Sequence, residues 1–452
     1  MSAAVVVFTR DLRVRDHPAL AAAVASADRI VPLFVFDDAV LGRFGAPNRV
    51  RYLLDSLADL DGSLRRLGGA LVVRRGAWAP TVAALVAETG AAAVHLGADV
   101  SALATRRLAG LRRAVGERVA VHDHPGITVV PPLAVGPASG GPGVIFTPYY
   151  KRWAVAPWRA LAPTPTALRL PDGLDPGRLP ALGELTAGAP SPDVLAGGET
   201  VATERLRRWA AEHLAAYDTG RDDLAAASTS RISADVHFGC LSPLEVATRL
   251  RDRPGGGPFV RQLCWRDFYA QLLAARPQVA TGDVRDARIA WVEGDEADEG
   301  FAAWAEARTG YPVVDAAMRQ LRAEGFVHNR ARMIVASFLC KDLAVDWRRG
   351  AAHFLDWLVD GDLASNQLNW QWTAGTGTDS NPSRIFNPTV QSTRFDPRGD
   401  YIRRWLPELG SVTGKEIHAP EPATRRRCGY PGPVVDHAEA IAAYKARNAG
   451  RR

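Results

Sequence analysis

The stretches Ala3-Ala-Val-Val-Val-Phe8 and Ile30-Val-Pro-Leu-Phe-Val-Phe36 begin the pattern that decides the fold of the N-terminal part of the chain. Three further apolar runs follow at residues 70–73, 92–96 and 119–122. Helix-like segments separate the five runs, and one of them, residues 48–67, has its leucines on a single stripe with a period of about 3.6. Strands that alternate with crossover helices form parallel sheets. The sequence therefore predicts a doubly wound α/β domain with a five-stranded parallel sheet over residues 1–130.

The rest of the chain has a different composition. Residues 131–200 are rich in proline and glycine, which predicts a long connector between domains. From residue 201 to 452 the strand signals fade and amphipathic segments dominate, so this part is predicted to be an all-α domain. The expected helices cover residues 203–217, 242–251, 259–275, 312–322 and 330–343.

The overall composition limits the class of protein. With 452 residues, 47% of them hydrophobic, the chain can build two or three domain cores, which excludes a disordered protein or a small disulfide scaffold. No apolar run is long enough to span a membrane. The N-terminal apolar run lacks a preceding basic region, which indicates a strand and not a signal peptide, so we expect a cytoplasmic protein. The four cysteines are too far apart for a Cys-x-x-Cys metal or cluster motif.

The charge and the first loop leave the type of ligand open. The net charge is +6 and its basic side is nearly all arginine, which suits a polyanionic partner but also fits the codon usage of a GC-rich genome. Thr9-Arg-Asp-Leu-Arg13 follows the first strand, where a G-x-G-x-x-G loop would be expected in a dinucleotide-dependent dehydrogenase. The sequence therefore argues against an ordinary dehydrogenase.

Three segments of the second half carry candidate site residues. Tyr217 and Ser228-Thr-Ser-Arg-Ile-Ser-Ala-Asp235 offer hydroxyls and a cation that suit a diphosphate, although two successive helix caps would use the same residue types. Residues 262, 265, 266 and 269 share one helix face, and residues 329, 330 and 333 share another. Each face is expected to bind a ligand, to form a buried ion pair or to be exposed to solvent. Residues 360–372 combine two carboxylates, amides and two tryptophans. A cofactor cradle fits them better than a metal site or a glycosidase acid pair.

Together these motifs resemble the photolyase and cryptochrome family. The resemblance extends from the Thr9–Arg13 motif to Arg403-Arg-Trp-Leu-Pro-Glu-Leu409, nearly the whole chain. It is strongest in Thr309–Leu321, His328-Asn-Arg-Ala-Arg-Met333, Asp360-Gly-Asp-Leu-Ala364 and Trp370-Gln-Trp372. The resemblance implies a class I enzyme that repairs cyclobutane pyrimidine dimers in UV-damaged DNA, by light-driven electron transfer from reduced FAD to a dimer flipped out of the duplex.

The resemblance also implies a bent FAD inside the helical domain. Arg332 would pair with Asp360 around the isoalloxazine, and Asp362 would lie beside it. Asn366 would face flavin N5, where a neutral amide suits an anionic reduced flavin and so favours repair over signalling. The implied FAD-binding residues are Tyr217, Thr229, Ser230, Arg231, Ser233, Arg266, Asn329, Arg332, Asp360, Asp362 and Asn366.

A lesion pocket and a phosphate-binding rim follow from the same resemblance. Trp265 and Trp372 would form apolar walls for the flipped dimer, completed by Asn329 and Met333. Gln262 stands where the family has a dimer-contacting glutamate; it still donates and accepts hydrogen bonds but carries no charge. Arg221, Arg330 and Arg384 would bind the flanking phosphates, an interaction that weakens with salt.

Finally, the resemblance implies a tryptophan chain and an antenna. Trp370 and Trp347 match its proximal and middle members, and Trp291 is the candidate for the distal one. The N-terminal domain would hold 8-hydroxy-5-deazaflavin in preference to methenyltetrahydrofolate, or no antenna. The alternatives are a cryptochrome-like blue-light photoreceptor or a (6-4) photoproduct enzyme; the latter carries adjacent histidines where this chain has His328 and Asn329. We expect the protein to bind no metal, to have no obligate protein partner and to be a monomer.

Overall fold

The computed structural model describes residues 2–136, 141–226 and 228–450. Part of the predicted connector, residues 137–140, lies outside the described residues, as do residues 1, 227, 451 and 452. The N-terminal part contains the predicted five-stranded sheet, with all neighbours parallel and the order β3-β2-β1-β4-β5. Its strands are β1 (Ala3–Val7), β2 (Arg29–Phe36), β3 (Val72–Arg75), β4 (Ala93–Gly97) and β5 (Ala120–His124).

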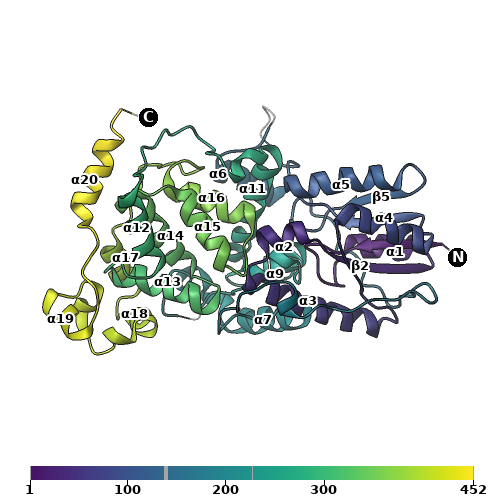
Figure 1. Ribbon diagram of the computed structural model, residues 1–452, viewed down its shortest axis with the longest axis horizontal. Helices are drawn as coiled ribbons and strands as arrows, with labels where there is room; N and C mark the ends of the chain where they lie inside the picture. Colours follow the sequence, from purple (N-terminus) through teal and green to yellow (C-terminus); the bar gives the residue numbers. More distant parts are fainter. Residues whose placement is uncertain (1, 137–140, 227, 451–452) are drawn as a thin grey trace.

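Strands β1 and β2 are buried on both faces because helices cover both sides of the sheet, whereas the edge strand β5 is largely exposed (Figure 1). Alternate residues of β1 point to opposite faces, so Val6 packs with α1 (Pro18–Ser26) and α3 (Pro47–Arg66), whereas Val5 packs with α4 (Trp78–Thr89) and α5 (Ala102–Val115). Burial on both sides explains why the strands are continuous apolar runs without polar alternation. The prediction of a doubly wound α/β domain is confirmed.

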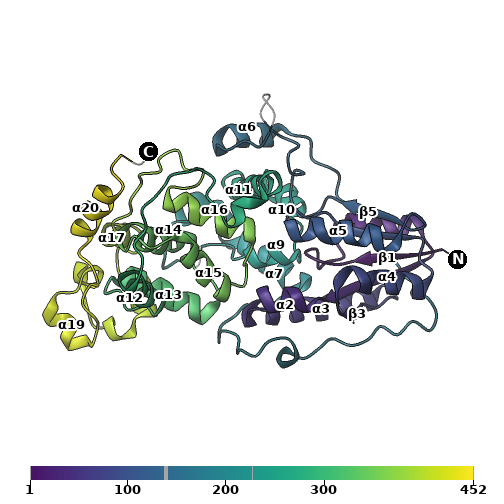
Figure 2. The same ribbon diagram turned by 45° about the horizontal axis from the view of Figure 1, so that its top comes forward.

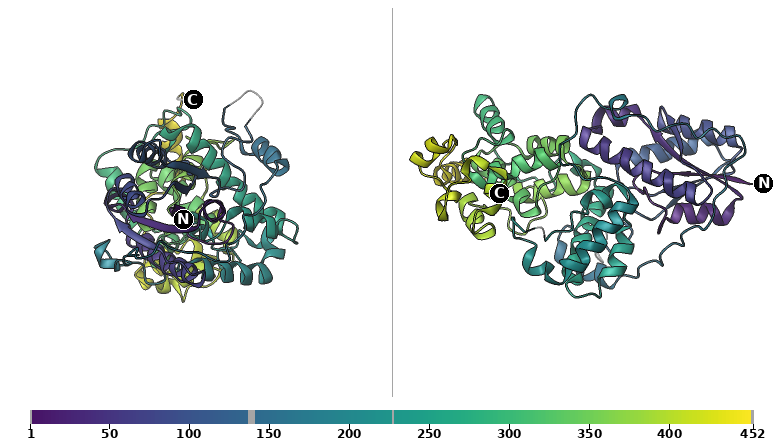
Figure 3. Two further views of the ribbon diagram at one scale, coloured as in Figure 1. Left: turned by 90° about the vertical axis from the view of Figure 1, so that its right-hand side faces the viewer. Right: turned by 90° about the horizontal axis from the view of Figure 1, so that it is seen from below.

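The remainder is helical, and it lies beside the sheet domain along the long axis of the molecule (Figure 3). None of the described helices is long and apolar enough to cross a membrane. The helices after residue 198 are α7 (Glu199–Glu212), α8 (Tyr217–Gly220), α9 (Ser233–Phe238), α10 (Pro243–Leu250), α11 (Gly256–Ala275), α12 (Asp295–Ala305), α13 (Pro312–Glu324), α14 (Asn329–Ser337), α15 (Trp347–Trp357), α16 (Leu363–Ala374), α17 (Pro388–Phe395), α18 (Asp400–Trp405), α19 (Pro422–Cys428) and α20 (His437–Arg447).

Two predicted helices have the wrong extent. The helix expected over residues 203–217 ends at Glu212, and a 3-10 turn separates it from α8. The helix expected over 330–343 ends at Ser337 and continues as a π-helix, Phe338–Asp342. The wider turn accompanies the placement of Lys341, whose buried Nζ donates to the carbonyl of Ala374 at 2.6 Å, next to the end of α16. A hydrophobic period cannot reveal such a contact, because it depends on a helix elsewhere in the chain.

The predicted connector contains a helix that packs on the helical half of the molecule. This helix, α6 (Phe146–Val155), lies against α11 (Figure 2), where the Phe146 and Trp265 rings stack with centroids 3.6 Å apart. Further along, the connector runs past the sheet domain and bonds to it, for example from Val73 N to the carbonyl of Pro176 at 2.8 Å. The connector is therefore a strap with defined contacts to both halves.

The loop after β1 joins the two halves of the molecule. Leu12 N donates to the carbonyl of Phe238, and the buried Arg13 donates to that of Gly239 at 3.0 Å. Gly239 has φ +72°, and a Cβ there would collide with the backbone of Arg10. Only glycine allows this close approach, which brings Arg10 next to the helical domain.

A cluster of histidines in the sheet predicts a loss of stability in acid. His95 lies beside His122 and His124, with its Nδ1 3.0 Å from His124 Nε2, and burial lowers the pKa of His95 from 6.5 to about 4. Between these values the unfolded chain binds a proton that the folded chain excludes, so stability falls as the pH falls. From pH 7 to pH 5 this amounts to about 2 kcal/mol. Denaturant unfolding at several pH values measures this effect, and the His95→Phe variant is expected to lose less stability over that range than the wild-type protein.

Candidate functional site

The expected pair of Arg332 with Asp360 is present. Arg332 on α14 places Nη2 2.9 Å from Oδ2 and Nη1 3.4 Å from Oδ1 of Asp360, which lies in the turn between α15 and α16. Arg332 Nε donates to the carbonyl of Val327 at 2.8 Å, so the guanidinium is fixed from both sides. A paired charge of this kind lines a site without adding net charge to it.

Asp362 is held as an anion by a residue from the other domain. Its carboxylate caps α16 by accepting from Ser365 N at 2.8 Å, and it lies 2.5 Å from Nη2 of Arg10 and 3.5 Å from Nδ1 of His237. Burial raises the pKa of Asp362, but Arg10, His237 and Arg266 outweigh burial and hold it well below its usual value. Neither Arg10 nor His237 was predicted to belong to the site. The only signal for them in the sequence is the unusual loop after the first strand.

The predicted diphosphate segment presents unused donors. The hydroxyls of Thr229, Ser230 and Ser233 are half-buried and make no hydrogen bond to another described residue. Arg231, whose φ is +54°, pairs with the buried Glu324 at 3.1 Å, and within the described residues its buried Nε has no partner. A small hollow is lined by Arg231 and Ser233 on one side and by Asp360 on the other. Free hydroxyls and a fixed cation fit a diphosphate, and the adjoining charge pairs fit a polar ring system.

One face of α16 carries three of the predicted residues at helical spacing. Asp362, Asn366 and Trp370 follow one another at intervals of four, so they lie along the same side. Asn366 is buried and donates to the carbonyl of Ala351 at 3.0 Å and to Gln367 at 2.9 Å. The amide is therefore fixed between the carboxylate of Asp362 and the indole of Trp370.

The predicted tryptophan chain lies in the core of the helical domain. Trp370 and Trp347 are buried, at 3% and 0% exposure, and Trp291 is half-buried at the edge of the same hydrophobic cluster. Gly350 on α15 lies directly against the Trp370 ring, where any Cβ would collide. Trp304, which was not predicted from the sequence, is a direct ring neighbour of Trp370, with centroids 6.0 Å apart.

The predicted lesion residues are half-buried or exposed. One face of the Trp265 indole is covered by Phe146, and the guanidinium of Arg384 lies 5.4 Å from the Trp372 ring centroid. Asn329 Nδ2 is 3.9 Å from Sδ of Met333. Gln262 is half-buried and has no hydrogen bond to another described residue, so its amide is available to a ligand.

Arg266 and the three phosphate-binding candidates already have partners. Arg266 donates to the carbonyls of Ile127 and Val236, which ties α11 to the chain before it. No partners were predicted for the other three arginines. The structure pairs Arg221 with Asp218 at 3.3 Å, Arg330 with Asp222 at 2.9 Å and Arg384 with Asp379 at 3.2 Å. To bind a DNA phosphate, each of these arginines would therefore have to release the carboxylate with which it is paired.

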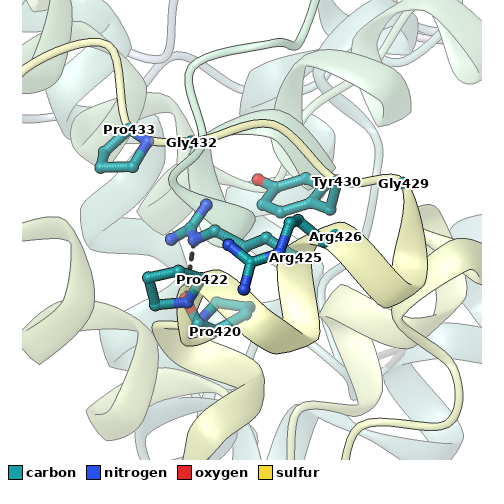
Figure 4. A pocket seen from close by; sticks show the side chains of 8 residues that line it. All are labelled: Pro420, Pro422, Arg425, Arg426, Gly429, Tyr430, Gly432 and Pro433. Atoms are coloured by element: carbon teal, nitrogen blue, oxygen red, sulfur yellow. Dashed lines mark hydrogen bonds between the residues drawn. The ribbon is translucent and has the colours of Figure 1, made fainter.

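A surface hollow of about 480 Å³ lies elsewhere, around α19 (Figure 4). Prolines 420, 422 and 433 line it together with Arg425 and Tyr430. Arg425 is committed to backbone carbonyls, including that of Pro420 at 2.6 Å. None of the predicted site residues lines this hollow, so it is separate from the site on α16.

Comparison with known proteins adds independent findings. The family described as "DNA photolyase" matches residues 4–168, and "FAD binding domain of DNA photolyase" matches residues 259–449. The chain is 49% identical to the deoxyribodipyrimidine photo-lyase of Streptomyces griseus, over 98% of this chain and 99% of that protein. It is 35% identical to cryptochrome DASH of Gloeobacter violaceus, over 97% and 94% of the two chains.

Solved structures agree with the sequence relatives. A bacterial class III photolyase from Agrobacterium tumefaciens superposes with a TM-score of 0.92 at 33% identity, over 100% of this chain and 98% of that one. An archaeal photolyase from Sulfolobus tokodaii with two FAD molecules superposes with a TM-score of 0.85 at 30% identity, over 98% and 99%.

Proposed function

Since the chain belongs to the photolyase and cryptochrome family, we propose that it repairs cyclobutane pyrimidine dimers in UV-damaged DNA by light-driven electron transfer from reduced FAD. The observation that carries the proposal is the face of α16, where Asp362, Asn366 and Trp370 follow one another beside the Arg332–Asp360 pair. This arrangement joins a site for a polar ring system to an oxidisable side chain. Reduced FAD, when bound and excited by light, would supply the electron that splits the dimer and would take it back afterwards.

The chain's own residues would bind and orient the two ligands. Thr229, Ser230, Arg231 and Ser233 would hold the FAD diphosphate, because the three hydroxyls make no hydrogen bond to another described residue, and Arg231 and Ser233 line the same small hollow. The anionic Asp362, held by Arg10, would accept a hydrogen bond from the flavin ring. Trp265 and Trp372 would stack on the flipped bases, and Gln262 would bond to a pyrimidine edge as a neutral donor and acceptor.

The finer assignments are also part of the proposal. We assign the chain to cyclobutane lesions, because Asn329 and Met333 occupy positions where (6-4) enzymes carry histidine. The class I assignment stays a prediction, and one of the superposed photolyases is a class III enzyme. His328 caps α14 by accepting from Arg330 N at 3.2 Å, and burial lowers its pKa to about 4, so it is neutral at pH 7 and a weak proton donor. The cytoplasmic location, the monomeric state and the domain limits expected from the sequence stay predictions.

An antenna is proposed for the N-terminal domain, with 8-hydroxy-5-deazaflavin favoured over methenyltetrahydrofolate. Ligands of doubly wound domains bind at the carboxyl ends of the strands. There the half-buried ion pairs of Arg107 with Asp37 and of Arg10 with Asp99 provide polar contacts. Reconstitution with each chromophore, followed by the excitation spectrum for repair, identifies the antenna.

One experiment separates repair from signalling. The purified protein is mixed with a dimer-bearing oligonucleotide, the flavin is reduced chemically, the sample is illuminated with blue or near-ultraviolet light, and the restored thymines are quantified by chromatography. Repair in light and none in darkness is the expected result. Equal repair in darkness would contradict the proposal. A flavoprotein that never restores thymine would also contradict it and would favour the photoreceptor alternative.

The paired arginines give a prediction for DNA binding. Asp222→Asn frees Arg330 from its carboxylate, so affinity for damaged and undamaged DNA should rise together and the salt dependence should steepen by about one counterion. Fluorescence anisotropy at several salt concentrations measures both effects. Asp172→Asn, which frees Arg29 in the sheet domain, is the matched control and should change neither. An unaltered salt slope in Asp222→Asn would exclude Arg330 from phosphate binding.

A further inference from the structure

Two tryptophans belong to the same hydrophobic cluster as Trp370 and could donate an electron to it once it is oxidised. Trp304 on α12 meets it edge-on, with ring centroids 6.0 Å apart. Trp347 lies on α15 three residues before Gly350, the residue in direct contact with the Trp370 ring, and positions three apart share a helix face. An electron deficit on Trp370 therefore has two directions in which to move.

The two neighbours are equally buried but have different hydrogen-bond acceptors. Both side chains are 0% exposed. Trp304 Nε1 donates to the neutral backbone carbonyl of Val335 at 3.0 Å, whereas Trp347 Nε1 donates to the carboxylate of Asp283 at 2.9 Å. An anionic acceptor stabilises positive charge on the donor far more than a neutral one does. Because burial is matched, the charge of the acceptor distinguishes the two indoles.

The other charges around Trp347 leave a net negative environment. The guanidinium of Arg348 lies 4.9 Å from the Trp347 ring centroid and would oppose oxidation. However, it is paired with two carboxylates, Asp283 at 2.9 Å and Asp346 at 3.0 Å. Two carboxylates and one guanidinium sum to one negative charge. The three charged side chains are half-buried, but the indole beside them is fully buried, so their net charge lowers the cost of removing an electron from it.

The loop that carries Asp283 is fixed to α16. Gln371, which follows Trp370 and is fully buried, donates from Nε2 to the carbonyl of Val279 at 2.8 Å and accepts from Val284 N at 2.8 Å. Gln367 on the same helix donates to the carbonyl of Ala280 at 2.7 Å. The helix that presents Trp370 therefore also positions the carboxylate that contacts Trp347, which a mobile surface ion pair would not do.

The surroundings of Trp304 offer no comparable stabilisation. Its ring neighbours include Phe301, Phe354 and His353, with centroids 5.8, 6.0 and 5.4 Å away. Burial lowers the pKa of His353 to about 4, so the imidazole is neutral at pH 7. An electron deficit on Trp304 would meet neutral groups in the core. The segment that carries the half-buried Trp291 instead bonds to the chain just before Trp347, from Val292 N to the carbonyl of Ala344 at 2.9 Å.

We propose that Asp283 is a positioning residue for photoreduction, whose carboxylate makes Trp347 easier to oxidise than Trp304 and so directs the electron deficit of Trp370 outward. One electron moves from Trp347 to oxidised Trp370, the next from Trp291 to Trp347, and a soluble thiol reductant refills Trp291. No bond is made or broken in the transfers between tryptophans. The thiol that refills Trp291 loses its S–H proton to solvent, and two of the oxidised thiols join as a disulfide. The inference rests on the proposed function, because it assumes that photoexcited flavin oxidises Trp370.

Asp283→Asn tests this inference, because it keeps the size of the side chain and a hydrogen-bond acceptor while it removes the charge. The quantum yield of flavin photoreduction should fall about tenfold, the ratio that corresponds to ~1.4 kcal/mol, and transient absorption should show a shorter-lived tryptophan radical. Adding Trp304→Phe to this variant should restore the quantum yield, because the competing electron donor to Trp370 is then gone. Asp283→Glu should retain it, and Arg348→Gln, which removes the opposing cation, should lengthen the radical lifetime.

Asp286→Asn is the matched control. It removes a carboxylate three residues away that pairs with the exposed Arg288, and it should keep the wild-type yield. Wild-type yield in Asp283→Asn would overturn the inference, as would a loss that Trp304→Phe does not restore. Equal losses in Asp283→Asn and Arg348→Gln would indicate a purely structural role and also overturn it. Repair by chemically reduced wild-type protein tests the proposed function separately, so the two failures are distinguishable.

Discussion

Trp370→Phe is expected to abolish photoreduction of the bound flavin while chemically reduced protein still repairs dimers in light. Trp370 lies one turn beyond Asn366 on the face of α16 that forms the proposed flavin site, and both onward tryptophans are reached through it. Phenylalanine retains aromatic packing against Phe354 but is far harder to oxidise than indole. Flavin absorbance during illumination with excess thiol measures the first activity, and thymine restoration after chemical reduction measures the second.

A change two residues further along provides the matched comparison. Trp372→Ala should leave photoreduction intact and weaken binding of lesion-containing DNA by ~1–3 kcal/mol, the usual contribution of one aromatic side chain stacked on a base. Trp372 is half-buried beside Arg384, away from the buried tryptophan chain. Loss of both activities in both variants would contradict this division of roles, since it would mean that either change disturbs the whole helix.

Asp360→Ala is expected to produce protein that retains little or no FAD. The change leaves the half-buried Arg332 without its carboxylate partner. Breaking a fully buried pair costs about 3–5 kcal/mol, and partial exposure lowers that cost to about 1–3 kcal/mol. Because the cofactor-bound state carries this cost, affinity for FAD should drop by about 5- to 150-fold. The flavin-to-protein absorbance ratio after purification and a titration of the cofactor-free protein with FAD both measure the effect.

Glu408→Ala controls for the loss of an arginine–carboxylate pair as such. Glu408 lies 3.0 Å from Nη1 of Arg319 on α13, in the same domain as the proposed site but outside it. This variant should retain FAD at the wild-type ratio, and Asp360→Asn should fall between wild type and Asp360→Ala. Wild-type FAD affinity in Asp360→Ala would show that the Arg332–Asp360 pair does not contribute to the cofactor site.

Local patterns predicted much of this molecule. Apolar runs separated by helical segments specified the five-stranded sheet, because a sheet covered on both faces requires apolar residues at successive strand positions. The spacing of four between Asp362, Asn366 and Trp370 is enough to place them on one face of a helix, because residues four apart lie one turn from each other. The extents of α7 and α14 were predicted less well, because the end of a helix depends on what it meets.

The partners of the site residues came only from the tertiary structure. Arg10 reaches Asp362 across 352 residues of sequence, and Asp283 reaches Trp347 across 64. Which carboxylate faces which cation, and which of two equally buried tryptophans receives an anionic acceptor, depends on how loops pack between helices. The sequence by itself determined the elements and the residues that each one presents, because helical and strand periods are local. The folded structure decided the charges that tune those residues, because electrostatic interactions depend on distance in space and not on separation along the chain.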